Sequence, residues 1–122
     1  MKHFFLITMA FALILGGYSC SKDKAAPPLV GTACDSTKIS FTKAGKILSD
    51  KCATAGCHDA TRKQSGLDLS IYADCRTLIE GRDGLCNIKY ASGCSPMPPS
   101  GKMADSLISL IEQWKIDGYC AN

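Results

Sequence analysis

The chain has 122 residues, with 14 lysines and arginines against 11 aspartates and glutamates, so its formal net charge is +3. The basic residues are scattered and form no run suited to a phosphate backbone, which argues against nucleic acid as a partner. The eight cysteines are typical of an exported protein in an oxidising compartment, where disulfides persist.

Residues 1–19 predict a secretory signal peptide. A short basic start precedes a nearly unbroken apolar run from Phe4 to Leu15, which is shorter than the ~20 residues of a membrane span. Small residues then lead to Cys20 in a pattern that resembles the lipobox of bacterial lipoproteins, although Tyr18 departs from it. We interpret Cys20 as the lipidated residue; the alternative is ordinary cleavage nearby, with Cys20 as a spare thiol.

Residues 20–33 are polar and then proline-bearing, which predicts a flexible tether that holds a domain off a membrane. We therefore expect an exported lipoprotein, anchored to a membrane by its lipid and facing the periplasm or the cell surface. The folded domain is expected over residues 34–122. A domain of this size often needs a metal, a cofactor or disulfides to supplement its core.

The first predicted helix follows an extended entry at residues 39–41 and leads into Cys52. Thr42 is its expected N-cap, and Gly45 weakens it. Its apolar residues then fall at helical spacing: Ala44, Ile47 and Leu48.

The central feature of the sequence is Cys52 and Cys57 with His58 directly after the second cysteine, the attachment signature of a c-type haem. Each thiol can add across one haem vinyl group, and the adjacent histidine can then supply the proximal nitrogen to the iron. The usual spacing has two residues between the cysteines, whereas here four small residues, 53–56, must loop out. The alternative is a Cys52–Cys57 disulfide beside an ordinary histidine.

The second predicted helix follows residues 66–69, is capped by Ser70 and ends at Gly81. Its apolar face is expected to comprise Ile71, Cys75, Leu78 and Ile79. Residues 82–93 show no pattern that assigns them to an element. Residues 95–101 contain three prolines, which predicts an irregular segment because proline fixes φ and removes a backbone donor.

The last predicted helix is the clearest, because apolar residues follow the spacing i, i+3, i+4 and i+7: Leu107, Leu110, Ile111 and Trp114. Asp105 falls in its first turn, where the helix dipole favours a negative charge, and Gly118 ends it. No segment alternates long enough to predict a strand. The expected fold class is therefore all-α.

Removal of the leader would leave His58 as the only histidine, and Met97 and Met103 as the only methionines. Within one chain this excludes a bis-histidine haem, a histidine-rich zinc site and a histidine-based triad. A single haem would then be ligated by His58 and a methionine. Prolines on both sides of Met97 limit the freedom of its loop and favour it as the ligand, and Met103 is expected in the core.

Residues 39–118 resemble small bacterial class I c-type cytochrome domains. The resemblance rests on Cys57-His58, Gly66-Leu67-Asp68-Leu69-Ser70-Ile71-Tyr72, Met97-Pro98-Pro99-Ser100-Gly101-Lys102 and Leu110-Ile111-Glu112-Gln113-Trp114. It implies a small helical fold wrapped around one covalently attached haem c, with His58 and Met97 as axial ligands. The implied activity is electron transfer with a redox partner protein, not enzymatic catalysis.

Five cysteines are left over, and two disulfides among them would leave one thiol free: Cys34, Cys75, Cys86, Cys94 and Cys120. In the cytochrome family the first and last helices pack together, so the resemblance implies a Cys34–Cys120 disulfide.

Two other functions remain as alternatives. A disulfide-stapled secreted binding module without haem explains the cysteines, but not the histidine after Cys57 or the methionine among prolines. A haem enzyme such as a peroxidase needs an open iron site and a distal acid or base; no second histidine exists for this role, although a carboxylate could serve it. The basic residues near the motif are interpreted as solvated surface, with guidance of an acidic redox partner as the alternative: Lys43, Lys46, Lys51, Arg62 and Lys63.

Overall fold

The computed structural model describes residues 34–121, which form four α-helices and one short 3-10 turn. The elements are α1 (Phe41–Cys52), η1 (Gln64–Gly66), α2 (Tyr72–Gly81), α3 (Gly84–Lys89) and α4 (Asp105–Ile116). Within this range there is no strand, only an isolated parallel bridge between Ser40 and Cys120. The all-α fold class is confirmed. The predicted signal peptide and tether, including Cys20, lie outside the described residues.

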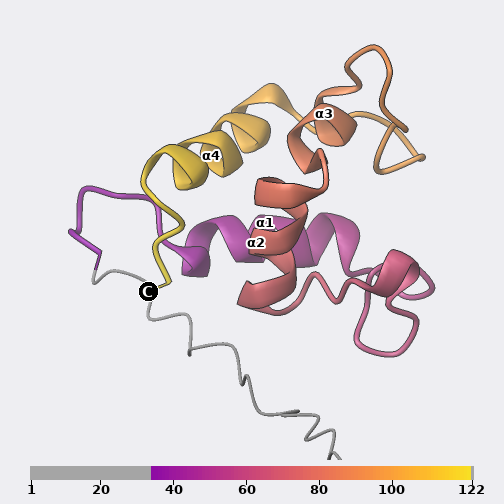
Figure 1. The fold of residues 1–122 in the computed structure, drawn as a ribbon, viewed down its shortest axis with the longest axis horizontal. Coiled ribbons are helices and arrows are strands. Elements are labelled where there is room, and N and C mark those ends of the chain that lie inside the picture. The colour runs from indigo at the N-terminus through magenta and orange to yellow at the C-terminus, as the bar shows by residue number, and fades with distance from the viewer. Residues whose placement is uncertain (1–33, 122) are drawn as a thin grey trace, which may run out of the picture.

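The helices pack in a closed set in which α1 contacts α4 and α2, and α3 contacts α2 and α4. Figure 1 shows α1 passing behind α2, with α4 at the upper left and α3 at the upper right of the view. The expected packing of the first helix against the last is confirmed. From residue 34 to residue 121, no helix has the length and apolar character to cross a membrane.

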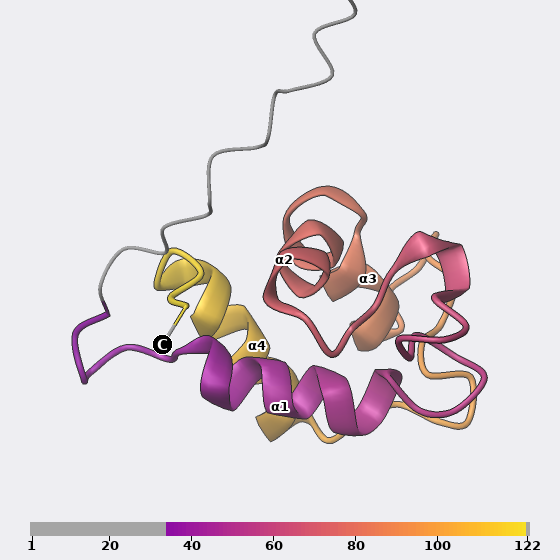
Figure 2. The same ribbon diagram turned by 90° about the horizontal axis from the view of Figure 1, so that it is seen from below.

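Two long connections lie at one end of the molecule, and the ends of the described chain lie at the other. The connections are residues 53–71, between α1 and α2, and residues 90–104, between α3 and α4. Both lie on the right in Figure 1, whereas residue 34 and the C-terminus lie on the left. The view from below in Figure 2 keeps the same separation.

α1 begins two residues earlier than expected, so the prediction of Thr42 as its N-cap is wrong. Ser40 is the N-cap, and the Phe41 N–H donates to the carbonyl of Cys120 at 2.8 Å, which supplies the first turn with a partner from the other end of the chain. Gly45 is buried in this helix, and a Cβ there would collide with the ring of Phe41. The glycine therefore permits the ring to lie flat against the helix.

α2 ends at Gly81 as predicted, but it begins differently. Ile71 is the N-cap and its side chain is 44% exposed, so its assignment to the buried face is wrong. Ser70 is not the cap, because its side chain and its N–H both donate to the carboxylate of Asp68. Cys75 and Ile79 form the buried face of the helix.

α4 spans Asp105–Ile116, with Asp105 in the first turn and Gly118 in the left-handed region at φ +83° just after the helix. Its buried face is rotated slightly from the predicted one: Ile108, Ile111 and Trp114 are buried, whereas Leu107 and Leu110 are half-buried. α3 was not predicted. It is only six residues long and is flanked by two non-glycine residues in the left-handed region, Asp83 and Tyr90.

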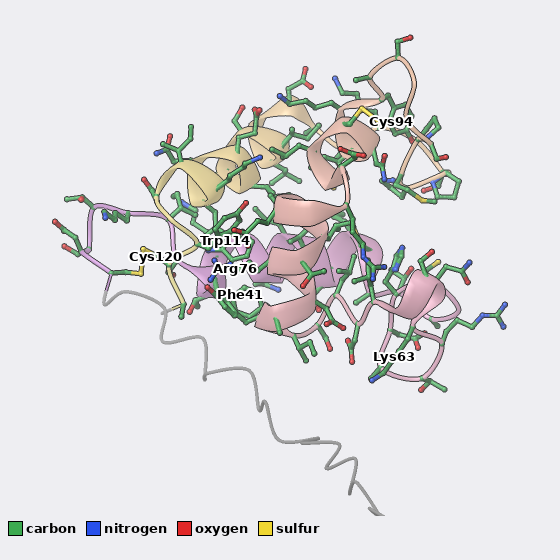
Figure 3. The ribbon with its side chains drawn as sticks, in the orientation of Figure 1. Phe41, Lys63, Arg76, Cys94, Trp114 and Cys120 are labelled. Carbon is green, nitrogen blue, oxygen red and sulfur yellow. A yellow bond between two sulfur atoms is a disulfide. The ribbon has the colours of Figure 1, made fainter. Side chains whose placement is uncertain are left out.

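The end of the domain near the chain termini is filled by aromatic rings, and we call it the packed end. Trp114 lies at its centre, 5.0 Å from Tyr119 and 5.9 Å from both Phe41 and Tyr72, measured between ring centroids. Its indole N–H donates to the Cys120 carbonyl at 2.9 Å. Figure 3 shows Phe41, Trp114 and Arg76 gathered there, close to Cys120.

The Cys34–Cys120 disulfide ties the two ends of the described chain together, with Cα atoms 5.5 Å apart, and this prediction is confirmed. A second disulfide joins Cys86 to Cys94. The free thiols among the described residues are those of Cys52, Cys57 and Cys75. The count of two disulfides and one spare thiol among the five remaining cysteines therefore holds.

Candidate cofactor-binding site

A cavity of about 720 Å³ lies between the two long connections, α2 and α3. Its lining includes Cys52, Cys57, His58 and Met97. These are the four residues that were predicted from the sequence to attach and ligate a haem. Met103 does not line it; this residue is 7% exposed and belongs to the hydrophobic core. The fold thus brings the Cys52–His58 segment and the Met97 segment to one space.

The four residues between the cysteines form a short closed loop. His58 N–H donates to the carbonyl of Cys52 at 3.1 Å, and Cys57 N–H donates to the carbonyl of Thr54 at 2.9 Å. Gly56 lies in the left-handed region at φ +81°, which a residue with a side chain rarely adopts. The extra residues therefore loop out, while the residues on either side of them remain hydrogen-bonded to each other.

Asp59 holds this loop in place and was not singled out from the sequence. Its carboxylate accepts backbone N–H bonds from Gly56 at 2.7 Å, Thr61 at 2.8 Å and Arg62 at 2.6 Å. These bonds, the one from Arg62 first, lower the pKa of Asp59. The only sequence signal was an aspartate directly after His58, among small and polar residues that favour turns.

The backbone of His58 is fixed on both sides. Its N–H is bound to Cys52 at the end of α1, and its carbonyl accepts from the Leu69 N–H at 2.9 Å. Leu69 belongs to a buried segment with Leu67, and both side chains line the cavity. The histidine is therefore positioned by main-chain bonds to two different parts of the fold.

The side chain of His58 has an unpaired polar atom. Its Nδ1 is buried and, within residues 34–121, has no hydrogen-bond partner. An unpaired buried polar atom costs about 1–3 kcal/mol. The described residues therefore leave this nitrogen unsatisfied, while other atoms of His58 line the cavity.

The two thiols of the motif are not joined to each other. Cys52 is buried, and burial followed by the proximity of Cys57 raises the pKa of its thiol to about 11. Cys75 is fully buried, and burial raises its pKa to about 12. Cys75 does not line the cavity, and its thiol donates to the Leu69 carbonyl. Among the free thiols of the described chain, only Cys52 and Cys57 face the cavity.

The rest of the lining combines apolar side chains with neutral polar residues and two cationic ones. Leu67, Leu69, Leu78 and Ile88 supply the apolar part. Lys51 and Arg82 also line the cavity, and its lining residues include no aspartate or glutamate. Arg82 donates to the carbonyl of Ser65 at 2.8 Å, which links the turn after α2 to η1. The cavity therefore suits a largely apolar ligand that carries negative charge.

Comparison of the chain with protein-family models, with characterised proteins and with solved structures finds no match. The residues that line the cavity are therefore the basis for inferring its function. No group of three or more histidine, cysteine, aspartate or glutamate side chains within residues 34–121 is arranged to hold a metal ion.

Proposed function

We propose that this protein is a monohaem c-type cytochrome that carries single electrons outside the cytoplasm. One observation carries the proposal: two free thiols, His58 and Met97 line the same cavity. Cys52 and Cys57 would hold the haem covalently, and His58 and Met97 would be its axial ligands. A haem bound there supplies an iron that gains or loses one electron.

The residues of the chain fit such a group in size and in polarity. The cavity of about 720 Å³ falls within the ~300–1,000 Å³ of sites for small molecules and cofactors. Haem is a flat apolar macrocycle with two carboxylate side chains. The leucine and isoleucine side chains would exclude water from the macrocycle, and Lys51 and Arg82 would offer positive charge to the carboxylates.

The proposed ligand pair favours a carrier over an enzyme. Methionine opposite histidine raises the reduction potential of a haem and fills the position that an enzyme leaves open for its substrate. His58 is the only histidine beyond residue 19, so no second imidazole serves as a distal acid or base. The partner would be another redox protein, and no residue here identifies it.

The alternative function is a disulfide-stapled secreted binding module without haem. The two disulfides fit this alternative as well as the cytochrome. Against it stand the two free thiols that line the cavity beside His58. A module that bound an apolar ligand reversibly would have no use for thiols in these positions.

A visible absorption spectrum of the exported protein separates the two functions. We expect haem bands, and we expect the colour to stay with the protein after acid–acetone extraction because thioether bonds resist it. A Cys52→Ala/Cys57→Ala variant should lose covalent haem, whereas Cys75→Ala, which removes the buried thiol outside the cavity, should retain it. A colourless wild-type protein would leave the binding module as the better explanation.

We also propose that the protein is exported and anchored through lipid on Cys20, a residue outside the described range. Acyl chains contribute about 0.8 kcal/mol per buried methylene, and stable anchoring takes two lipid signals. Cys20→Ser should therefore move the protein from the membrane fraction to the soluble exported fraction, as followed by fractionation and immunoblotting. Unchanged membrane association would contradict the lipid anchor without bearing on haem binding.

A further inference from the structure

The segment that carries Met97 belongs to no helix, and yet it is attached to α3 on both sides of the methionine. It lies within residues 90–104, the connection between α3 and α4. A thioether is a weak ligand for iron, so it binds well only where the protein already holds it in place. Three attachments to α3 order the loop at residues 90–104.

The first attachment is covalent. Cys86 on α3 forms a disulfide with Cys94, three residues before Met97, and their Cα atoms are 5.9 Å apart. Figure 3 shows this bond at Cys94, at the far end of the molecule from Cys120. The disulfide closes a loop of eight residues in sequence separation, so it restricts the approach to Met97 directly.

The second attachment is made by Met97 itself. Its N–H donates to the carbonyl of Asn87 at 3.1 Å, and Asn87 directly follows Cys86 on α3. Asn87 also lines the cavity. The backbone of the proposed ligand is therefore bound to the same turn of α3 that carries the disulfide.

The third attachment lies on the other side of Met97. Tyr90 is the C-cap of α3 and lies in the left-handed region at φ 59°, a conformation that is uncommon for a residue with a large side chain. Its hydroxyl donates to the carbonyl of Pro98. Strained backbone conformations often mark functional positions. Here the residue in the left-handed conformation is Tyr90, and its side chain binds Pro98, the residue after Met97.

We propose that Cys86, Cys94 and Tyr90 are positioning residues for the Met97 ligand; this inference rests on the proposed cytochrome function. Together with the Asn87 carbonyl they fix the loop to α3 before, at and after Met97. α3 in turn packs on α2 and α4, so the position of Met97 is set by the helical core. Pre-ordering of the loop lowers the entropy cost of ligation by the thioether.

Competition by an added ligand tests the proposal. Imidazole binds oxidised haem iron by displacing methionine, and its apparent affinity rises as the methionine is held less well. In Cys86→Ser/Cys94→Ser we expect the dissociation constant of imidazole to fall about tenfold or more, since the loop regains chain entropy. Tyr90→Phe, which removes only the hydroxyl, should lower it by a smaller factor of about threefold.

The other disulfide of the molecule supplies the matched control. Cys34→Ser/Cys120→Ser removes a disulfide at the packed end and should leave imidazole affinity and the weak red band of iron–methionine bonding unchanged. Equal imidazole affinity in wild type, Cys86→Ser/Cys94→Ser and Tyr90→Phe would overturn the proposal. If the double cysteine variant does not fold, the result for Tyr90→Phe decides.

Amide hydrogen exchange gives a readout that does not depend on haem. The Met97 N–H should exchange at least tenfold faster in Cys86→Ser/Cys94→Ser than in wild type, and at the wild-type rate in Cys34→Ser/Cys120→Ser. Unchanged exchange at Met97 would overturn the attachment of the loop. A wild-type protein without haem bands would instead overturn the proposed function, and with it the role of these residues in ligation.

Discussion

The packed end is filled by the chain's own aromatic side chains, whereas the opposite end, which we call the cavity end, surrounds a space of about 720 Å³. Phe41, Tyr72, Trp114 and Tyr119 contact one another edge-on or tilted at the packed end. At the cavity end the leucines and Ile88 line the space without filling it. The same small set of helices therefore builds a filled core at one end and a cavity at the other.

The two ends also differ in their polar side chains and in the partners of these side chains. At the packed end the Trp114 indole and the Tyr72 hydroxyl donate to the carbonyls of Cys120 and Tyr119, although the Tyr119 hydroxyl is itself buried and unpaired. At the cavity end His58 keeps an unpaired nitrogen and two thiols are unpaired. Each end thus has one buried polar atom without a partner, and what distinguishes the cavity end is that two free thiols line its open space.

The largest effect should follow from loss of the haem that we propose for the cavity. The total stability of a small domain is about 5–15 kcal/mol, and a haem would fill the space that this chain leaves open. We expect Cys52→Ala/Cys57→Ala to lower the free energy of unfolding by about 5 kcal/mol or more, measured by urea denaturation followed by circular dichroism. A haem-free variant as stable as wild type would show that the cavity end needs no ligand.

The second largest effect should follow at the packed end. Cys34→Ser/Cys120→Ser opens a disulfide with a sequence separation of 86 residues, which costs about 4 kcal/mol in the chain-entropy model. The absorption spectrum should not change, because the disulfide lies away from the cavity. Urea denaturation and a visible spectrum of the same sample measure both results. A spectral change would mean that the two ends are coupled.

The two methionines allow a direct test of the proposed ligand, because Met97 lines the cavity and Met103 lies in the core. Met97→Ala should abolish the weak red absorption band of the oxidised protein and lower its reduction potential, since it removes the proposed ligand. Met103→Leu, which conserves volume, should leave both unchanged and cost less than about 1.5 kcal/mol of stability. The reverse pattern would assign the ligand role to Met103.

The smallest effect concerns pH. The bonds to Asp59 lower its pKa, so its contribution is present above the ordinary aspartate pKa of about 4 and is lost as pH falls through the lowered value. The protection of the Gly56, Thr61 and Arg62 amides, measured relative to their intrinsic exchange rates at each pH, should therefore fall below about pH 4, and Asp59→Asn should show this loss of protection already at neutral pH.

Asp117 is the matched control at the packed end. Its carboxylate accepts from the Ile39 N–H at 2.7 Å, and this bond lowers its pKa in the same way. Asp117→Asn should quicken exchange at Ile39 and leave the loop around Asp59 unchanged. Equal exchange at Gly56 in wild type and Asp59→Asn would show that the carboxylate does not order the loop.

The sequence predicts those helices whose apolar residues repeat at helical spacing within one continuous segment. The helix that leads into Cys52 and the helix that contains Trp114 were both predicted from apolar residues at helical spacing, and both are seen. α3 could not be predicted, because six residues give no period and its caps, Asp83 and Tyr90, depend on left-handed conformations. The N-terminus of α1 was misplaced because its first N–H is bound by Cys120 from the other end of the chain.

Part of the proposed site could be predicted from the sequence, because attachment and ligation of haem require cysteine, histidine and methionine. Cysteine, histidine and methionine are few enough to be counted, and the fold places the four chosen ones around one cavity. The supporting residues were missed, since Asp59 and Tyr90 act through backbone groups that no motif marks. The Cys86–Cys94 disulfide was missed for a similar reason, because pairing depends on a loop that returns to α3.

The bond between Cys34 and Cys120 has a consequence for how the domain is presented to its surroundings. Any segment before residue 34 joins the domain at the packed end, on the side opposite the loops that surround the cavity (Figure 1). An attachment on that side leaves the loops around the cavity uncovered. If the protein carries electrons as we propose, a partner could approach the cavity end without meeting the attachment.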